Sequence, residues 1–288
     1  MTIQAAYKQL LATLYEIYGS REAANIADWV IENVTGQSKI NRILYKDLPV
    51  SVQQQERLHN ISLELLANKP VQYILNEVWF AGIKLYVDEH VLIPRPETEE
   101  LVDWIVTDLK NNVRQASPCP ALLDVGTGSG CIPIAIKKQV QALDVSALDV
   151  SAAALEVAKK NAAFQHAHIA FFKANFLDST TWNQFRKYDV IVSNPPYIKQ
   201  QEAVDMAKRV ADFEPAIALF VADEDALIFY KAIALFAQQH LQDSGSIYVE
   251  INEALGENVV EVFKSYGFSN IEMRQDLQGK DRMIKASK

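Results

Sequence analysis

The sequence is poor in the residues that mark secreted and metal-binding proteins. Only two cysteines and five histidines occur among its 288 residues. Cys119 and Cys131 have no spacing typical of metal ligands, so we expect reduced thiols in a cytoplasmic protein. The histidines are scattered and form no ligand pair, and we therefore expect no metal site.

The chain also has neither a membrane-directing segment nor an excess of basic residues. Residues 1–4 lack the basic and apolar regions of a signal peptide. No apolar run approaches the roughly 20 residues that span a bilayer. Lys and Arg number 28 against 36 Asp and Glu, a net charge of −8. That balance argues against a basic surface for duplex DNA, and we expect no direct contact with nucleic acid or a membrane.

Helical patterns fill the first quarter of the chain. Apolar residues recur at helical spacing in four segments of residues 1–70. Gly36 is placed to end the second helix, and Ser51 is placed to cap the fourth. None of these residues forms a pattern typical of catalysis. We expect a small helical bundle as the first domain.

A different pattern begins after residue 70. Residues 71–75 and 78–87 alternate between apolar and polar and are rich in aromatics. This alternation predicts a β-hairpin, which would make residues 71–96 a linker between two domains.

A proline-rich stretch ends this linker. Pro94 and Pro96 indicate a loop, and Thr98 is predicted to cap a helix that begins just after it. Composition alone predicts that Arg95 and Glu97 are solvent-exposed charged residues, and it assigns neither of them a role.

A strand, a glycine-rich loop and a helix follow one another from residue 121. The apolar segment 121–125 runs directly into Gly126, Thr127, Gly128, Ser129 and Gly130. Glycine allows backbone to approach a ligand or to take positive φ, and a helix N-terminus after such a loop can face a polar group. The spacing is G-x-G-x-G, without the Gly-Lys-Ser/Thr of a phosphate-binding loop. Within a βα repeat, it predicts a site for a nucleoside cofactor.

Two carboxylates compete for the ribose of such a cofactor. The end of the second strand needs an acidic residue that accepts hydrogen bonds from ribose hydroxyls. Asp144 and Asp149 both lie in this region. Asp149 directly precedes Ser151, a good helix N-cap, so it stands at the carboxyl end of the strand. We choose Asp149 and expect Asp144 to be a surface charge at the opposite end.

An aromatic residue follows the third predicted strand, residues 168–172. Phe176 could stack on a purine or belong to the core, and the sequence leaves both readings open. A long polar connection, residues 198–222, reaches the same edge of the sheet. Connections of this length often cover a substrate.

The fourth strand ends in a motif that cannot continue it. Residues 190–193 are β-branched or small, as expected of a buried strand, and Asn194, Pro195, Pro196 and Tyr197 follow. Proline offers no N–H to a sheet, so the chain leaves the strand in an extended form. The motif therefore presents an amide, a carbonyl and an aromatic ring at the edge where open α/β sheets bind ligands.

Three further strands are predicted after the motif, the last two as a hairpin near Gly279. Residues 97–288 then form an α/β domain with a seven-stranded, doubly wound, Rossmann-like sheet. The helical bundle and the hairpin linker precede it.

Together these motifs resemble those of the class I S-adenosylmethionine-dependent methyltransferases. Asn-Pro-Pro-Tyr is shared by adenine-N6 and protein glutamine-N5 methyltransferases. The stretch Leu92 to Glu99, the Phe213-Glu214-Pro215 segment and the helical front domain resemble the peptide chain release factor glutamine methyltransferases, the PrmC/HemK family. The likeness covers nearly the whole chain. It implies an enzyme whose partners are class-1 release factors, docked by residues 1–70. Apart from the resemblance, we expect a cytoplasmic monomer.

The resemblance assigns roles to the motif residues. The five residues of the glycine loop and Asp149 would hold the methionine and ribose parts of S-adenosylmethionine, with Phe176 near the adenine. Asn194, Pro195, Pro196 and Tyr197 would hold the substrate glutamine, and Asn194 would also touch the cofactor. Asn175 stands where the family often has Asp, so its role is open. The role of Glu214 is open as well.

The chemistry of a carboxamide explains the motif. The nitrogen is a poor nucleophile because its lone pair is delocalised into the carbonyl. Two acceptors, the Asn194 side-chain oxygen and the Pro195 carbonyl, can hold both amide N–H groups and direct the lone pair, while Tyr197 packs on the flat amide. Positioning and fixed dipoles then lower the barrier, and no general base is required beforehand. An adenine-N6 methyltransferase is the alternative, but it would need a basic recognition region and base extrusion. A non-catalytic cofactor-binding module fits the intact motif poorly.

Overall fold

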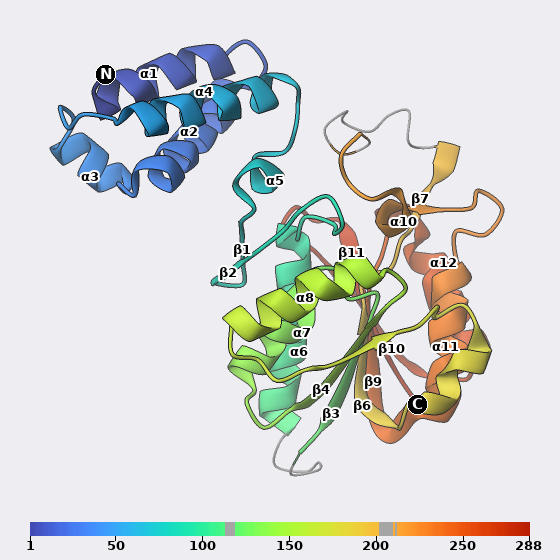
Figure 1. Ribbon diagram of the computed structural model, residues 1–288. Helices are drawn as coiled ribbons and strands as arrows, with labels where there is room; N and C mark the ends of the chain where they lie inside the picture. The colour runs from blue at the N-terminus through green and yellow to red at the C-terminus, as the bar shows by residue number, and fades with distance from the viewer. Residues whose placement is uncertain (113–118, 202–209, 211) are drawn as a thin grey trace. The chain divides into compact units, whose positions relative to one another are not determined.

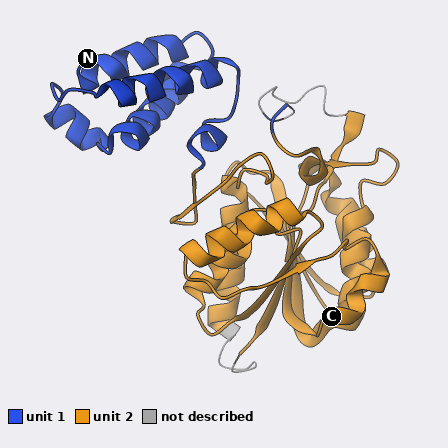
Figure 2. Cartoon of the chain, in the orientation of Figure 1, with its two compact units in different colours: residues 1–76, 207–213 blue, residues 77–206, 214–288 orange. Residues whose placement is uncertain are grey.

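The computed structural model describes residues 1–112, 119–201, 210 and 212–288. The chain divides into two compact units (Figure 2). The first comprises residues 1–76 with the described residues of 207–213, and the second comprises residues 77–206 and 214–288. Within the described ranges, no helix is both long and apolar enough to cross a bilayer.

The first unit is a bundle of helices (Figure 1). Its helices are α1 (Ile3–Leu14), α2 (Ser20–Thr35), α3 (Lys39–Leu44), α4 (Val52–Leu66) and α5 (Val71–Leu75). Gly36 takes φ 72° and ends α2, as predicted. Ser51 caps α4 through the N–H of Gln54, whose side chain caps Ser51 in return. Leu14, Ile31 and Leu65 are fully buried in the apolar core.

Helix α5 corrects the predicted start of the linker. Residues 71–75 were expected to form a strand, but Pro70 starts a short helix, and its carbonyl accepts from the N–H groups of Tyr73 and Ile74. Val71 and Leu75 are four residues apart, so a helix directs both into the bundle core. The hairpin is shorter than predicted and consists of β1 (Val78–Phe80) and β2 (Ile83–Leu85).

The second unit contains the predicted seven-stranded sheet. Its strands are β3 (Ala121–Val125), β4 (Asp144–Asp149), β5 (Ala170–Lys173), β6 (Tyr188–Ser193), β9 (Leu241–Glu250), β10 (Asn270–Gln275) and β11 (Asp281–Ser287). Their order is β10-β11-β9-β6-β3-β4-β5. The five strands from β9 to β5 are parallel, and β11 runs antiparallel to both of its neighbours. The strand order reverses between β3 and β6, which defines the switch point where such sheets bind ligands.

Helices cover both faces of this sheet. Figure 1 shows α6, α7 and α8 on one face and α11 and α12 on the other. Their bounds are α6 (Pro96–Asn112), α7 (Cys131–Gln139), α8 (Ala152–Phe164), α11 (Ile228–His240) and α12 (Gly256–Ser265). Between the sheet and α11 lies an apolar core that contains Ile191, Tyr230 and Phe236.

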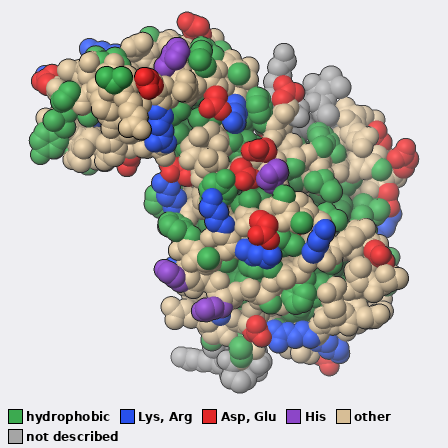
Figure 3. Space-filling view, viewed as in Figure 1, with side chains coloured by type: hydrophobic (Ala, Val, Ile, Leu, Met, Phe, Trp, Pro, Cys, Tyr) green, Lys and Arg blue, Asp and Glu red, His purple; other side chains and the backbone are tan. Residues whose placement is uncertain are grey.

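Shorter elements lie in the connection between β6 and α11. They are β7 (Ile198–Lys199), α10 (Ala216–Leu219) and β8 (Phe220–Val221), and β7 pairs with β8 in parallel. Part of the predicted substrate-covering connection, residues 202–209 and 211, lies outside the described residues. On the face drawn in Figure 3, the described basic and acidic side chains are interspersed and form no continuous basic stripe.

Candidate active site

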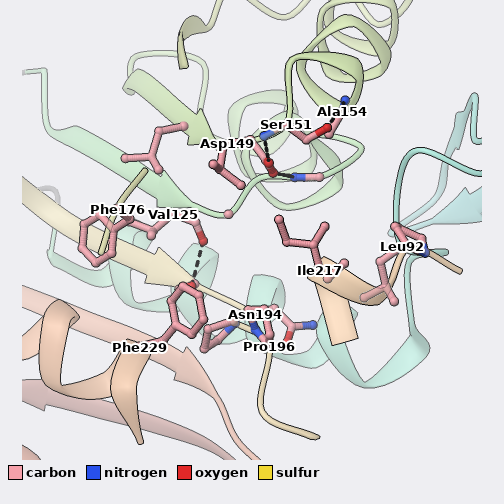
Figure 4. A pocket seen from close by; sticks show the side chains of 18 of the residues that line it. Leu92, Val125, Asp149, Ser151, Ala154, Phe176, Asn194, Pro196, Ile217 and Phe229 are labelled. Atoms are coloured by element: carbon pink, nitrogen blue, oxygen red, sulfur yellow. Dashed lines mark hydrogen bonds between the residues drawn. The ribbon is translucent and has the colours of Figure 1, made fainter. Parts of the chain in front are cut away.

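A cavity of about 310 Å³ opens at the carboxyl ends of β3, β4 and β6 (Figure 4). All of its lining residues belong to the second unit. The walls come from the segments after these three strands and after β5, together with parts of the proline-rich loop and of α10 and α11. The cavity thus lies beside the switch point between β3 and β6, as the fold predicts.

The glycine loop forms one wall. Gly126 and Gly128 line the cavity, at φ 75° and 53°, which side chains rarely adopt. A Cβ added at either would meet no heavy atom within 4 Å, so the loop leaves open space where a ligand can approach its backbone. Gly130 serves a different purpose: a Cβ there would lie 3.2 Å from Ala158, so its absence permits α7 and α8 to pack closely.

Asp149 joins this loop to the end of β4. Its carboxylate accepts from the backbone N–H of Gly128 and of Ser151, both at 2.9 Å (Figure 4). Burial raises the pKa of this carboxyl, and the backbone hydrogen bonds oppose that rise. Asp144 begins β4 at the other end, where its half-exposed carboxylate pairs with Arg186 at 2.6 Å. Only Asp149 therefore lines the cavity.

Three buried polar side chains at the glycine loop lack partners. Asp124, Thr127 and Ser129 are each at least 95% buried, yet neither oxygen of Asp124 nor either hydroxyl has a hydrogen bond within the described residues. Burial raises the pKa of Asp124 to about 7; the nearby Thr127 hydroxyl opposes this rise, although its geometry falls short of a hydrogen bond, and the Asp149 charge adds to it. Such groups are costly unless a ligand supplies the missing partners. The sequence reasoning missed Asp124, although an acid in an otherwise apolar strand was the available signal.

The segment after β5 combines core and cavity contacts. Phe176 is buried against Trp182 and Phe236, with ring centroids 5.6 and 5.3 Å apart, and it also lines the cavity. The two readings of Phe176 are therefore compatible. Asn175 lines the cavity as well, and its side-chain oxygen accepts from the N–H of Leu177 at 3.2 Å.

The motif after β6 forms the facing wall. Asn194, Pro195 and Pro196 line the cavity, whereas Tyr197 is not among the lining residues. The Tyr197 hydroxyl instead points to the carboxylate of Glu250, 3.4 Å away. The hydroxyl of Ser193 donates to the carbonyl of Val125 at 2.7 Å (Figure 4). That bond holds the ends of β6 and β3 together, so the motif stays next to the glycine loop.

Arg95 and Glu214, whose roles the sequence left open, form an ion pair at the edge of the cavity. The buried Glu214 accepts from the Arg95 guanidinium at 2.6 Å and from the N–H of Ile93 at 3.1 Å. Arg95 is therefore not a free solvated charge. The pair ties the proline-rich loop to the segment that contains Pro215, and both contribute cavity residues. Glu97 lies elsewhere and accepts from the side chain of Gln278 at 3.2 Å.

The helix cap predicted at Thr98 is wrong. Helix α6 begins at Pro96, three residues before the predicted start at residue 99, because proline suits the first position of a helix. Thr98 lies inside the first turn, and its hydroxyl contacts Glu250 and the amide of Asn194. Among the described residues, no group of three His, Cys, Asp or Glu side chains could hold a metal ion.

Comparison with known proteins covers both units. Residues 5–75 match the model of the PrmC N-terminal domain, and residues 104–213 match that of the methyltransferase small domain. A solved structure, the hMettl16 catalytic domain with a MAT2A 3′UTR hairpin, shares the fold: its TM-score is 0.55 at 15% identity, over 83% of each chain.

Two relatives are similar over almost their entire length. The release factor glutamine methyltransferase of Flavobacterium psychrophilum is 39% identical, over 100% of this chain and 99% of its own. That of Bacteroides thetaiotaomicron is 37% identical over 96% of each chain. With matching domains, order and length, the chain belongs to the family of release factor glutamine methyltransferases.

Proposed function

We propose that the protein transfers a methyl group from S-adenosylmethionine to the side-chain amide nitrogen of the glutamine in the Gly-Gly-Gln loop of class-1 release factors. Such methylation modulates translation termination. The observation that carries the proposal is the placement of Asn194 and Pro195 across one cavity from Asp149 and the glycine loop. An amide-recognition motif and a nucleoside-binding loop thereby face the same space.

The residues present fit the cofactor. S-adenosylmethionine, when bound, supplies an electrophilic methyl group on a sulfonium. Asp149 keeps lone pairs for ribose hydroxyls after it accepts from two backbone N–H groups. Asp124, Thr127 and Ser129 do not line the cavity themselves but alternate along the chain with the lining residues Val125, Gly126 and Gly128, where their polar groups would suit the charged amino-acid end of the ligand. Gly126 and Gly128 leave room for close approach, and Phe176 offers an apolar surface for the adenine.

The motif residues would activate the substrate by orienting it. The Asn194 side-chain oxygen and the Pro195 carbonyl would accept the two N–H groups of the substrate amide, which directs the nitrogen lone pair toward the methyl group. Holding reactants in one geometry can lower a barrier by several kcal/mol, roughly 7–11 in favourable cases. Tyr197 would restrain the motif from behind through Glu250. No base is needed before transfer, because the proton can leave the product nitrogen afterwards.

The proposed organisation assigns residues 1–70 to docking of the release factor, 71–96 to the linker and 97–288 to catalysis. We propose a cytoplasmic monomer, in line with the bacterial relatives whose names describe release factor methylation.

One assay tests the proposal. Tritiated methyl transfer is measured to a purified class-1 release factor, to its Gln→Ala variant and to duplex DNA. We expect label in the release factor that vanishes with the Gln change. Label in DNA, or label in both release factors, would contradict the proposal.

A further inference from the structure

A buried chain of hydrogen bonds lies behind Asn194. It contains Thr98 in the first turn of α6, Glu250 at the end of β9, and Tyr197. Thr98 and Glu250 are 2% and 1% exposed. The Thr98 hydroxyl lies 2.6 Å from one oxygen of Glu250 and 3.1 Å from the side-chain nitrogen of Asn194. Thr98, which lies outside the motif, thus contacts the first side chain of the motif, and Glu250 contacts both Thr98 and Tyr197.

The number of available hydrogen atoms determines which group donates and which accepts in each of these hydrogen bonds. Above pH 7, where Glu250 is mostly ionised, its carboxylate only accepts, so the single hydroxyl hydrogen of Thr98 is donated to Glu250. The Thr98 oxygen can then only accept from Asn194, which must present its NH₂ group rather than its oxygen. The Tyr197 hydroxyl donates to the other Glu250 oxygen at 3.4 Å, and the Tyr230 hydroxyl donates to the Glu250 backbone carbonyl at 3.1 Å. Two hydroxyls therefore hold the carboxylate of Glu250, and a third holds its backbone.

The opposite end of the Asn194 amide is its oxygen. Within the described part of the chain, that oxygen has no hydrogen bond, and Asn194 lines the cavity. We propose that Thr98 and Glu250 are positioning residues for methyl transfer, which orient the Asn194 amide so that its oxygen, not its nitrogen, meets the substrate amide. This inference rests on the proposed function, because a rotated amide would present a donor to a donor.

The cost of burying Glu250 supports a functional role. Burial raises the pKa of Glu250 to about 7, opposed by the Thr98 hydrogen bond and by the Arg282 charge, while Glu97 adds to the rise. Well-packed apolar residues often replace buried charges without loss of stability. A carboxylate is nevertheless present here, and it is the group that forces the Thr98 hydroxyl to point away from Asn194.

The first test compares two substitutions of Thr98. Thr98→Val keeps the shape but removes the hydroxyl, and we expect the kcat for release factor methylation to fall on the order of 10- to 100-fold. Cofactor affinity should not change, since Thr98 does not line the cavity. Thr98→Ser restores a hydroxyl and should recover kcat. Thr107→Val, the same change at an exposed position of α6, is the matched control and should leave kcat unchanged.

Equal kcat in Thr98→Val and wild type would overturn the inference, as would equal losses in Thr98→Val and Thr98→Ser. Should Thr98→Val fail to fold, Glu250→Gln decides. The Gln amide can donate to Thr98, so the Thr98 hydroxyl is no longer forced to donate to residue 250 and can donate to Asn194 instead. We therefore expect kcat to fall while cofactor affinity stays unchanged. Wild-type kcat in that variant would contradict the inference. Failure of the proposed function is seen separately, as absence of release factor labelling by the wild-type enzyme.

Discussion

The two walls of the cavity differ in how their polar groups are satisfied. On the β3 side, Asp124 and two loop hydroxyls are buried without partners in the described chain. On the β6 side, the amide nitrogen of Asn194 is already bonded to Thr98, which is bonded to Glu250. Behind each wall lies a deeply buried carboxyl, Asp124 or Glu250, whose pKa is raised to about 7 by burial.

This difference predicts that the two walls act differently on their ligands, the cofactor and the substrate amide. Behind the glycine-loop wall, polar groups lack hydrogen bonds, and we expect binding of the cofactor to this wall to satisfy them. Behind the other wall, the amide nitrogen of Asn194 is already bonded, which leaves its oxygen available as an acceptor. An Asn194 side chain that is already held in place suits the substrate amide nitrogen, a weak nucleophile that has to be oriented rather than deprotonated. Changes to the first wall should therefore alter cofactor binding, and changes to the second should alter turnover.

The largest effect is expected from Asn194→Ala. It removes the acceptor that orients the substrate amide, and kcat should fall on the order of 10³-fold. Cofactor affinity, measured by calorimetry, should stay largely intact. Turnover by this variant at the wild-type rate would contradict the proposed mechanism.

On the other wall, Asp149→Ala should weaken cofactor binding roughly 100-fold. The variant loses acceptors for the ribose and two charge-assisted bonds that hold Gly128 and Ser151, each worth about 1.5–3 kcal/mol. Asp144→Ala is the matched control, the same change at the opposite end of β4. Cofactor titration should show a lower affinity in Asp149→Ala than in Asp144→Ala. Equal affinities would show that Asp149 does not bind the cofactor.

Asp124→Asn should stabilise the free protein while it weakens cofactor binding. The folded pKa is about 7 and the ordinary value 3.8, so between these values the folded state binds more protons than the unfolded state. The free energy of unfolding therefore falls as pH rises through this window, and the loss is complete above it. At pH 8 the variant should be more stable than the wild type by roughly 2–4 kcal/mol.

Urea unfolding at pH 5 and pH 8 checks this expectation. The wild type should lose stability between the two values, and Asp124→Asn should change less. Glu250, whose pKa burial also raises to about 7, is present in both proteins, so the difference between them reports Asp124. Parallel pH dependence in the two proteins would refute the assignment of a raised pKa.

The smallest effect concerns the ion pair at the cavity edge. Arg95→Ala leaves the buried Glu214 without its guanidinium and should lower the free energy of unfolding by about 1–3 kcal/mol. Arg186→Ala breaks a half-exposed pair with Asp144 and should cost at most about 1 kcal/mol. Thermal unfolding of both variants at one pH makes the comparison, and equal losses would mean that burial does not distinguish the two pairs.

Local sequence patterns were sufficient for most of the fold. Apolar runs and glycine or serine signals predicted the four main helices of the first unit and the seven strands. They also placed Asp149 rather than Asp144 at the cavity, because Ser151 marks the carboxyl end of β4. The strand expected at residues 71–75 was wrong because five residues are too few to separate helical from alternating spacing.

Contacts distant in sequence could not be predicted in the same way. Thr98 meets Glu250 across 152 positions, and Arg95 meets Glu214 across 119. Each pair depends on how the sheet brings its strand ends and loops together. Thr98 resembled a helix cap because nothing local distinguishes a threonine that caps from one that bonds a distant carboxylate.

The most direct measurement maps the transferred methyl group by mass spectrometry of a digested class-1 release factor. The account predicts a single methyl group on the glutamine side chain of the Gly-Gly-Gln peptide after incubation with the wild-type enzyme, and none after incubation with Asn194→Ala. A methyl group on another residue, or equal modification by both enzymes, would contradict it.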